Sequence, residues 1–105
     1  MSLSGLRGSL VEAEHNYRKC LLDGVDRVEL GRSHRARARE PARGAVPLLG
    51  ESVKDSVIDL TDAYEDFFSR FAKDRSGDDL ATMIDRKQRT VDEEIEASLR
   101  SLPSA

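Results

Sequence analysis

Apolar residues recur at spacings of three and four over residues 3–30, which keeps them on one side of an α-helix. We therefore expect one amphipathic helix that ends near Gly31 or frays toward Pro41. The apolar positions of this segment are Leu3, Leu6, Leu10, Ala13, Tyr17, Leu21, Val25 and Val28.

A second apolar stripe, over residues 52–74, is the most regular in the chain. Its alternating spacings of four and three form a heptad pattern, which favours packing against other helices at a shallow crossing angle. Ser52 and Asp55 are spaced as in a capping box, and Gly77 suits the left-handed residue that often closes a helix. The stripe is made of Val53, Val57, Leu60, Tyr64, Phe67 and Phe71, and Phe68 widens it.

Residues 78–102 predict a third helix, which starts at the acidic pair Asp78 and Asp79 and stops before Pro103. The short turn before it predicts an antiparallel hairpin with the second helix. Lys87 and Glu94 fall inside its apolar stripe, so we expect them at the rim of the core or in a contact between subunits. The apolar positions are Leu80, Ile84, Val91, Ile95, Leu99 and Leu102.

Residues 31–50, GRSHRARAREPARGAVPLLG, separate the first two predicted helices. Glycines, two prolines and five arginines predict a flexible Arg-rich connector with little regular structure. The length of 105 residues suits a single domain spanning residues 1–105. The predicted fold is all-α: a three-helix bundle, or a helical hairpin plus an N-terminal helix, that packs as a dimer.

The composition agrees with helices, because 35% of residues are charged and only five are aromatic, which argues against a β-sandwich or barrel. No apolar run approaches the roughly 20 residues that cross a bilayer, and the first residues do not resemble a secretory signal. The single Cys20 cannot form an internal disulfide. We therefore expect a cytoplasmic protein with no membrane contact.

Charge is segregated along the chain. Residues 31–50 carry a charge of +4, whereas the whole chain carries −3, so the remainder carries −7. Four aspartates on the second helix recur at spacings of four, three and four, on the side opposite its apolar stripe. They are either a solvated helix face or a docking surface for the arginines, which bind carboxylates through paired hydrogen bonds. The candidate charged surface comprises Arg32, Arg35, Arg37, Arg39, Arg43, Asp55, Asp59, Asp62 and Asp66.

Catalysis and metal binding have little support. Glu12 and His15 have the Glu-x-x-His spacing of di-iron bundles, but they project away from the apolar stripe of their helix. Residues 74–85 do not match a calcium loop, because the sixth position is Asp79 in place of glycine and the twelfth is Asp85 in place of glutamate. Cys20 lies at the edge of an apolar stripe, where burial keeps a thiol protonated. We expect no catalytic residue, no metal and no cofactor.

These observations favour a non-enzymatic helical interaction or assembly module whose partner is a second copy, as a homodimer, or another protein. The expected packing or dimer interface is Val57, Leu60, Tyr64, Phe67, Phe68, Phe71, Lys87 and Glu94. One alternative is a nucleic-acid-associated protein that binds phosphates through the Arg-rich connector. That segment has no aromatic residue to stack on a base, and the sequence pI is near 5.4. A second alternative is an accessory subunit or secretion-associated helical protein that folds with its partner.

Overall fold

The chain is all-α, as the periodicity predicted. A computed structural model describes residues 3–44 and 46–101; within them, the side chains of residues 3–5, 40–44, 46–49 and 101 lie outside the description. Over these ranges the chain forms four α-helices, one short 3-10 helix and no strand. The elements are α1 (Leu3–Asp23), α2 (Val28–Gly44), α3 (Val46–Asp74), η1 (Asp78–Leu80) and α4 (Ala81–Ser101).

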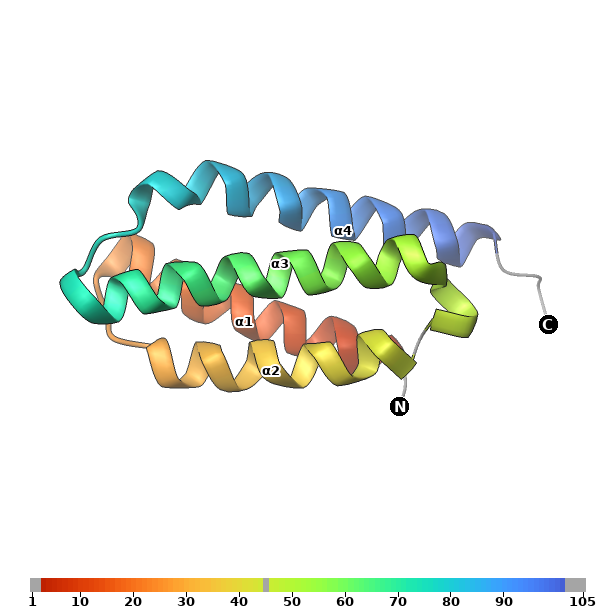
Figure 1. The fold of residues 1–105 in the computed structure, drawn as a ribbon, viewed down its shortest axis with the longest axis horizontal. Coiled ribbons are helices and arrows are strands. Elements are labelled where there is room, and N and C mark those ends of the chain that lie inside the picture. The colour runs from red at the N-terminus through yellow and green to blue at the C-terminus, as the bar shows by residue number, and fades with distance from the viewer. Residues whose placement is uncertain (1–2, 45, 102–105) are drawn as a thin grey trace.

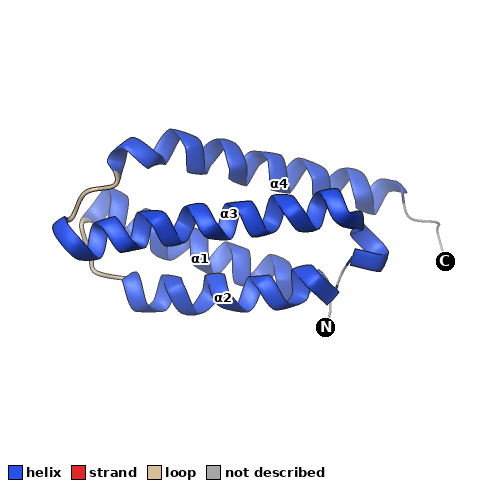
Figure 2. Ribbon diagram, viewed as in Figure 1, coloured by secondary structure: helices blue, strands red, loops and turns tan. Residues whose placement is uncertain are grey.

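Consecutive helices run in opposite directions and form an elongated bundle of 49 × 23 × 19 Å (Figure 1). The α1–α2 loop and the α3–α4 loop lie at the same end of the bundle (Figure 2). Helix α2 packs against α1 and α3, and α4 packs against α3. Helices α2 and α3 therefore each lie between two neighbours, and α3 is the one that joins α2 to α4.

The core is built mainly from α1, α3 and α4. Tyr64, Phe67 and Phe68 of α3 have no exposed surface, and Tyr17 of α1 contacts Phe67 edge-to-face with ring centroids 4.9 Å apart. Among its described side chains, those of residues 28–39, helix α2 contributes Val28 and Ala38 to the buried apolar set. The remaining core residues are Leu6, Leu10, Ala13, Cys20, Val53, Val57, Leu60, Ala63, Phe71, Ile84, Val91 and Ile95.

The prediction of a flexible connector over residues 31–50 is wrong, because residues 28–44 form the regular helix α2. Arginine, alanine and glutamate are good helix formers, and they outweigh the glycines and prolines of this segment. Pro47 lies in the first turn of α3, where a missing backbone N–H breaks no helical hydrogen bond. The fold is thus a bundle of four helices over the described residues, and not of three.

The predicted end of the first helix near Gly31 is also wrong. Gly24 adopts a left-handed φ of 66°, and its N–H donates to the Cys20 carbonyl over 3.1 Å, which closes α1 at Asp23. Helix α2 then begins at Val28, whose N–H donates to Asp26 Oδ1 over 3.2 Å. Val28 continues the spacing of the apolar residues of α1 in the sequence, and it is buried as they are. It nevertheless belongs to the next helix, α2.

The helix predicted over residues 52–74 is confirmed as one continuous helix with a buried apolar side. Helix α3 starts earlier, at Val46, but Gly50 breaks the helical backbone with φ 86° and ψ 166°. The regular helix therefore begins close to the expected position.

The end of α3 agrees with the prediction, but a different residue closes it. Helix α3 ends at Asp74, and Arg75 takes the left-handed conformation expected of Gly77, with φ 61°. The Asp74 carboxylate accepts a hydrogen bond from Ser76 N–H over 3.0 Å, which stabilises the tight turn into η1. This turn sets α4 antiparallel to α3.

Candidate functional site

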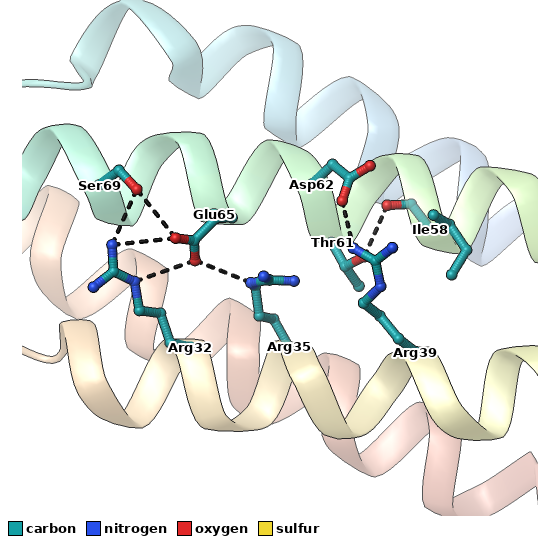
Figure 3. Close-up of polar contacts among 8 residues, drawn as sticks. All are labelled: Arg32, Arg35, Arg39, Ile58, Thr61, Asp62, Glu65 and Ser69. Carbon is teal, nitrogen blue, oxygen red and sulfur yellow. Dashed lines mark hydrogen bonds and ion pairs between the residues drawn. The ribbon is translucent and has the colours of Figure 1, made fainter.

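The candidate site is the charged seam between α2 and α3, where arginines of one helix meet acidic residues of the other (Figure 3). Arg32, Arg35 and Arg39 are spaced by three and four residues, which places them along one face of α2. That face lies against α3. The seam therefore unites parts of the chain that are 23 to 37 residues apart in sequence.

Glu65 is the centre of this seam. Its Oε2 accepts hydrogen bonds from Arg32 Nε over 3.2 Å and from Arg35 Nε over 3.1 Å. Ser69 donates to Glu65 Oε1 over 3.1 Å, and Arg32 Nη2 donates to Ser69 Oγ over 3.0 Å (Figure 3). One turn away, Arg39 donates to Asp62 Oδ1. The network holds the orientation of α2 relative to α3, because paired guanidinium–carboxylate bonds are directional.

The electrostatics of the seam favour the ionised form of Glu65. Burial alone would raise the pKa of this carboxyl group, but hydrogen bonds from Arg35, Arg32 and Ser69 outweigh it and lower the pKa below its ordinary value. Arg35 has a largely covered side chain, and its Nη1 is buried without a hydrogen-bond partner. The surrounding donors therefore hold Glu65 as a carboxylate within the seam.

The structure divides the acidic row of α3 between two neighbours. Asp62 faces α2 and binds Arg39, whereas Asp59 forms an ion pair with Lys87 of α4. Asp55 and Asp66 are exposed, and no ion pair to another described side chain involves them. The four aspartates thus do not form one surface.

Two of the predicted arginines lie outside the seam. Arg37 is exposed, and the Arg43 side chain lies outside the described residues. Conversely, Glu65 was not among the predicted residues, although it lies three residues after Asp62 and within the acidic row. The row was drawn from aspartates alone, and Glu65 could have been found by including glutamate.

The residues predicted as a packing or dimer interface form the interior of a single chain. Val57, Leu60, Tyr64, Phe67, Phe68 and Phe71 are all less than 5% exposed within one chain. Lys87 and Glu94, which we expected at the rim of the core or in a contact between subunits, have partners inside the chain. Lys87 binds Asp59, and Glu94 accepts hydrogen bonds from Ser56 Oγ over 3.1 and 3.0 Å. The α3 stripe needs no second subunit to be covered.

A polar residue of α4 that the sequence did not single out is buried in this interior. Gln88 is 8% exposed, and its Oε1 accepts a hydrogen bond of 2.5 Å from the Tyr64 hydroxyl. Its Nε2 donates to Asp92 Oδ1 over 3.3 Å. Gln88 lies between Ile84 and Val91 in the apolar stripe, so its position could have suggested a buried polar contact.

The structure also places the other residues that were considered for metal binding or catalysis. Glu12 and His15 are exposed, and the described residues include no group of three or more His, Cys, Asp or Glu side chains that could hold a metal ion. Cys20 is buried, and burial raises the pKa of its thiol. Glu14 lies within reach of Arg18, which donates to it over 3.0 Å.

Five large apolar side chains stay exposed on the described surface. Three of them surround the α1–α2 loop: Leu22 in the last turn of α1, Val25 in the loop and Leu30 in the first turn of α2. The other two are Val11 of α1 and Met83 of α4. None of the helices in residues 3–44 and 46–101 combines the length and apolar character needed to span a membrane.

Comparison of the chain with models of known protein families, with curated proteins and with solved structures gave no match.

Proposed function

We propose that this chain is a non-enzymatic helical interaction module that self-associates as a dimer through the end of the bundle at the α1–α2 loop. The observation that supports this proposal is the exposure of Leu22 (71%), Leu30 (49%) and Val25 (43%) within one helical turn of that loop. The core is already complete within one chain, so these side chains have no packing role inside it. Covering a Leu or Val side chain contributes about 1.5–3 kcal/mol, which makes this end a favourable contact surface.

A second copy suits this surface because its charges are balanced. Residues 19–32 contain three basic and three acidic residues, whereas the whole chain carries −3. A two-fold contact repeats the same patch on both subunits, so a patch with no net charge meets its copy without net repulsion. The proposed contact thus differs from the α3 stripe and the Arg-rich segment that the sequence suggested.

The nucleic-acid alternative loses its main support. Arg32, Arg35 and Arg39 are engaged by Glu65 and Asp62, and releasing them for phosphates would break the α2–α3 seam. The absence of aromatic residues from 31–50 also stands against stacking on bases. A cytoplasmic location remains part of the proposal, since a lone buried thiol fits a reducing compartment.

Sedimentation velocity over a wide concentration range tests the proposal. We expect the wild-type mass to shift from monomer to dimer, and the double variant Leu22→Ser/Leu30→Ser to stay monomeric. Val11→Ser is the matched control, because Val11 is also an exposed apolar residue of α1 (62%) but lies three turns from the loop. It should dimerise like the wild type.

The same measurement at low and high salt separates apolar from ionic association, because salt screens exposed charges. Dimerisation through the loop end should change little with salt. A wild-type chain that stays monomeric at every concentration, or a double variant that dimerises normally, would show that this surface does not join two copies.

A further inference from the structure

The turn between α3 and α4 is short and contains two residues with positive φ. Only residues 75–77 separate the end of α3 at Asp74 from the start of η1 at Asp78. Arg75 has a φ of 61° and Gly77 a φ of 126°. Glycine adopts positive φ readily, but for arginine this region is unfavourable because Cβ approaches the following carbonyl oxygen. A short turn under strain favours exchange of the element that follows it between two copies of a chain.

Helix α4 docks on the body formed by α1, α2 and α3. Its apolar side faces the core, where Ile84, Val91 and Ile95 are at most 1% exposed. Its backbone packs along α3, whereas toward α1 it makes ion pairs such as Arg7–Glu96, which is about half exposed and holds the helices together only weakly. A second copy of the chain has the same body and therefore offers α4 the same surface.

A buried hydrogen bond sets the register of α4 on this body. The Tyr64 hydroxyl of α3 donates to Gln88 Oε1 of α4 over 2.5 Å, and Gln88 is only 8% exposed. Leaving a buried polar group without its partner is costly, so α4 keeps this register on whichever body it docks. The contact between Tyr64 and Gln88 lies within one chain in the closed monomer and joins two chains after exchange.

The hinge lies at the end of the bundle where we propose self-association, because the α1–α2 and α3–α4 turns share that end (Figure 2). If residues 75–77 become helical, α3 and α4 form one rod, and α4 extends past this end onto a second copy. Since α4 packs antiparallel to α3, the two bundles then meet end to end with their α1–α2 loops facing each other. The meeting ends carry four of the five large apolar side chains exposed on the described surface: Leu22, Val25, Leu30 and Met83.

We propose that two copies of this chain dimerise by exchanging α4, with residues 75–77 as the hinge. This inference rests on the self-association proposed above and specifies how the two copies are joined. Exchange keeps the contacts of α4 with the core, removes the left-handed conformation of Arg75 and covers the apolar side chains at the loop ends. Association costs translational and rotational freedom, so the closed monomer prevails at low concentration.

Sedimentation equilibrium of two hinge variants tests the proposal, because they shift the equilibrium in opposite directions. Gly77→Ala strains the closed turn, since its Cβ would lie 3.2 Å from Cδ2 of Phe67 at a φ of 126°, and alanine favours the continuous rod. We expect its dimer association constant to rise at least about tenfold. Arg75→Gly relaxes the closed turn and disfavours the rod, so its association constant should fall about tenfold.

Arg75→Gln is the matched control. It keeps a Cβ atom in the left-handed conformation but removes the guanidinium group, whose Cζ lies 4.8 Å from the centre of the Phe71 ring and which lies 3.9 Å from Asp26 Oδ2. Arg75→Gln should therefore associate like the wild type. A fall as large as that of Arg75→Gly would assign the effect to the lost guanidinium contacts and contradict the hinge.

Isotope-filtered NOE spectroscopy detects the exchange directly. Labelled and unlabelled chains are unfolded together, refolded and concentrated, so that mixed dimers form. In the dimer we expect NOEs between Tyr64 of one copy and Gln88 of the other. In the dilute monomer the same NOEs should arise within one copy only.

Two results would overturn the exchange: a dimer whose Tyr64–Gln88 NOEs stay within one copy, or hinge variants Gly77→Ala and Arg75→Gly that both associate like the wild type. If such a dimer is lost in Leu22→Ser/Leu30→Ser, association through the loop end stands and the exchange alone fails. NOEs between copies that persist in that double variant would support the exchange and contradict the loop-end contact. A wild type and a Gly77→Ala variant that are monomeric at every concentration would contradict both.

Discussion

At the scale of single residues, Glu65 shows how one side chain determines the orientation of a helix. It accepts hydrogen bonds from two arginines of α2 and from Ser69, and about two thirds of its side chain is covered. A carboxylate that accepts several hydrogen bonds has a fixed position, whereas an exposed ion pair such as Arg70–Asp79 contributes little to the stability of the fold. The seam therefore depends on Glu65 more than on any exposed aspartate of the row.

We predict that Glu65→Gln lowers the free energy of unfolding by about 1–2 kcal/mol at pH 7, because two charge-assisted hydrogen bonds become weaker. The pKa of Glu65 in the folded chain lies below its ordinary value. The contribution of Glu65 to the free energy of unfolding is therefore complete above about pH 4.5 and is lost as the pH falls through the lowered pKa. The difference between variant and wild type should shrink below about pH 4. Urea unfolding at both pH values measures this.

The neighbouring change Asp66→Asn serves as the control. Asp66 is exposed, and no ion pair to it is found among the described side chains. Its replacement should alter the unfolding free energy by less than about 0.5 kcal/mol. Equal urea midpoints for Glu65→Gln and wild type at pH 7 would show that the seam does not stabilise the fold.

At the scale of elements, α2 lies close to α3 because one of its inward positions has no side chain. A Cβ atom at Gly31 would be 2.1 Å from Cζ of Phe68, so the α2 backbone sits directly on that ring. The ring cannot move away easily, since Phe68 is fully buried and lies beside Tyr64 and Phe67. Glycine at this position permits close packing, although in the sequence it suggested a flexible connector.

We predict that Gly31→Ala destabilises the chain by about 1–3 kcal/mol, because the added methyl group overpacks the α2–α3 contact. Gly8→Ala is the matched control: Gly8 is also a helical glycine, and nothing lies within 4 Å of its Cβ position. That change should stabilise the chain by about 0.5–1 kcal/mol through helix propensity. Urea unfolding of both variants separates the two effects. Stabilisation by Gly31→Ala would mean that α2 does not pack on Phe68 as described.

At the scale of the whole molecule, the tyrosines connect three helices. Tyr17 of α1 and Tyr64 of α3 lie with ring centroids 5.5 Å apart, and the Tyr64 hydroxyl reaches Gln88 of α4. Burial is the main cause that raises the pKa of both hydroxyl groups, to about 12 for Tyr17 and further for Tyr64. Ionisation of either tyrosine is therefore coupled to opening of the bundle.

We predict that the free energy of unfolding is insensitive to these two groups below pH 10 and declines above it. Their folded pKa values are raised, so their contribution is complete below the unfolded value of about 10 and is lost as the pH rises. The slope should reach about 1.4 kcal/mol per pH unit for each tyrosine. The chain has two tyrosines and no tryptophan, so ultraviolet absorbance of tyrosinate reports directly on them. Normal titration near pH 10 in the folded chain would contradict their burial.

The sequence by itself determined the all-α fold, the inward face of α3 and the hairpin with α4. Val57, Tyr64 and Phe71 could be placed in the core because a heptad pattern and its polar reverse side are local properties of the chain. The burial of Cys20 could be expected from the apolar stripe of α1. Turn residues near Gly77 placed the end of α3 correctly, although Arg75 takes the left-handed conformation.

Only the tertiary structure decided that residues 28–44 form a helix and which charges they meet. Arginines and alanines favour a helix there, whereas glycines and prolines oppose it. The contact of Gly31 with Phe68 and the ion pair of Arg35 with Glu65 stabilise the helical conformation further. These partners lie 30 or more residues away, and they come into reach only because the chain reverses between α2 and α3, near the break of the helical backbone at Gly50. Local periodicity specifies which face of a helix is apolar, but the partner of each charge depends on where the chain reverses.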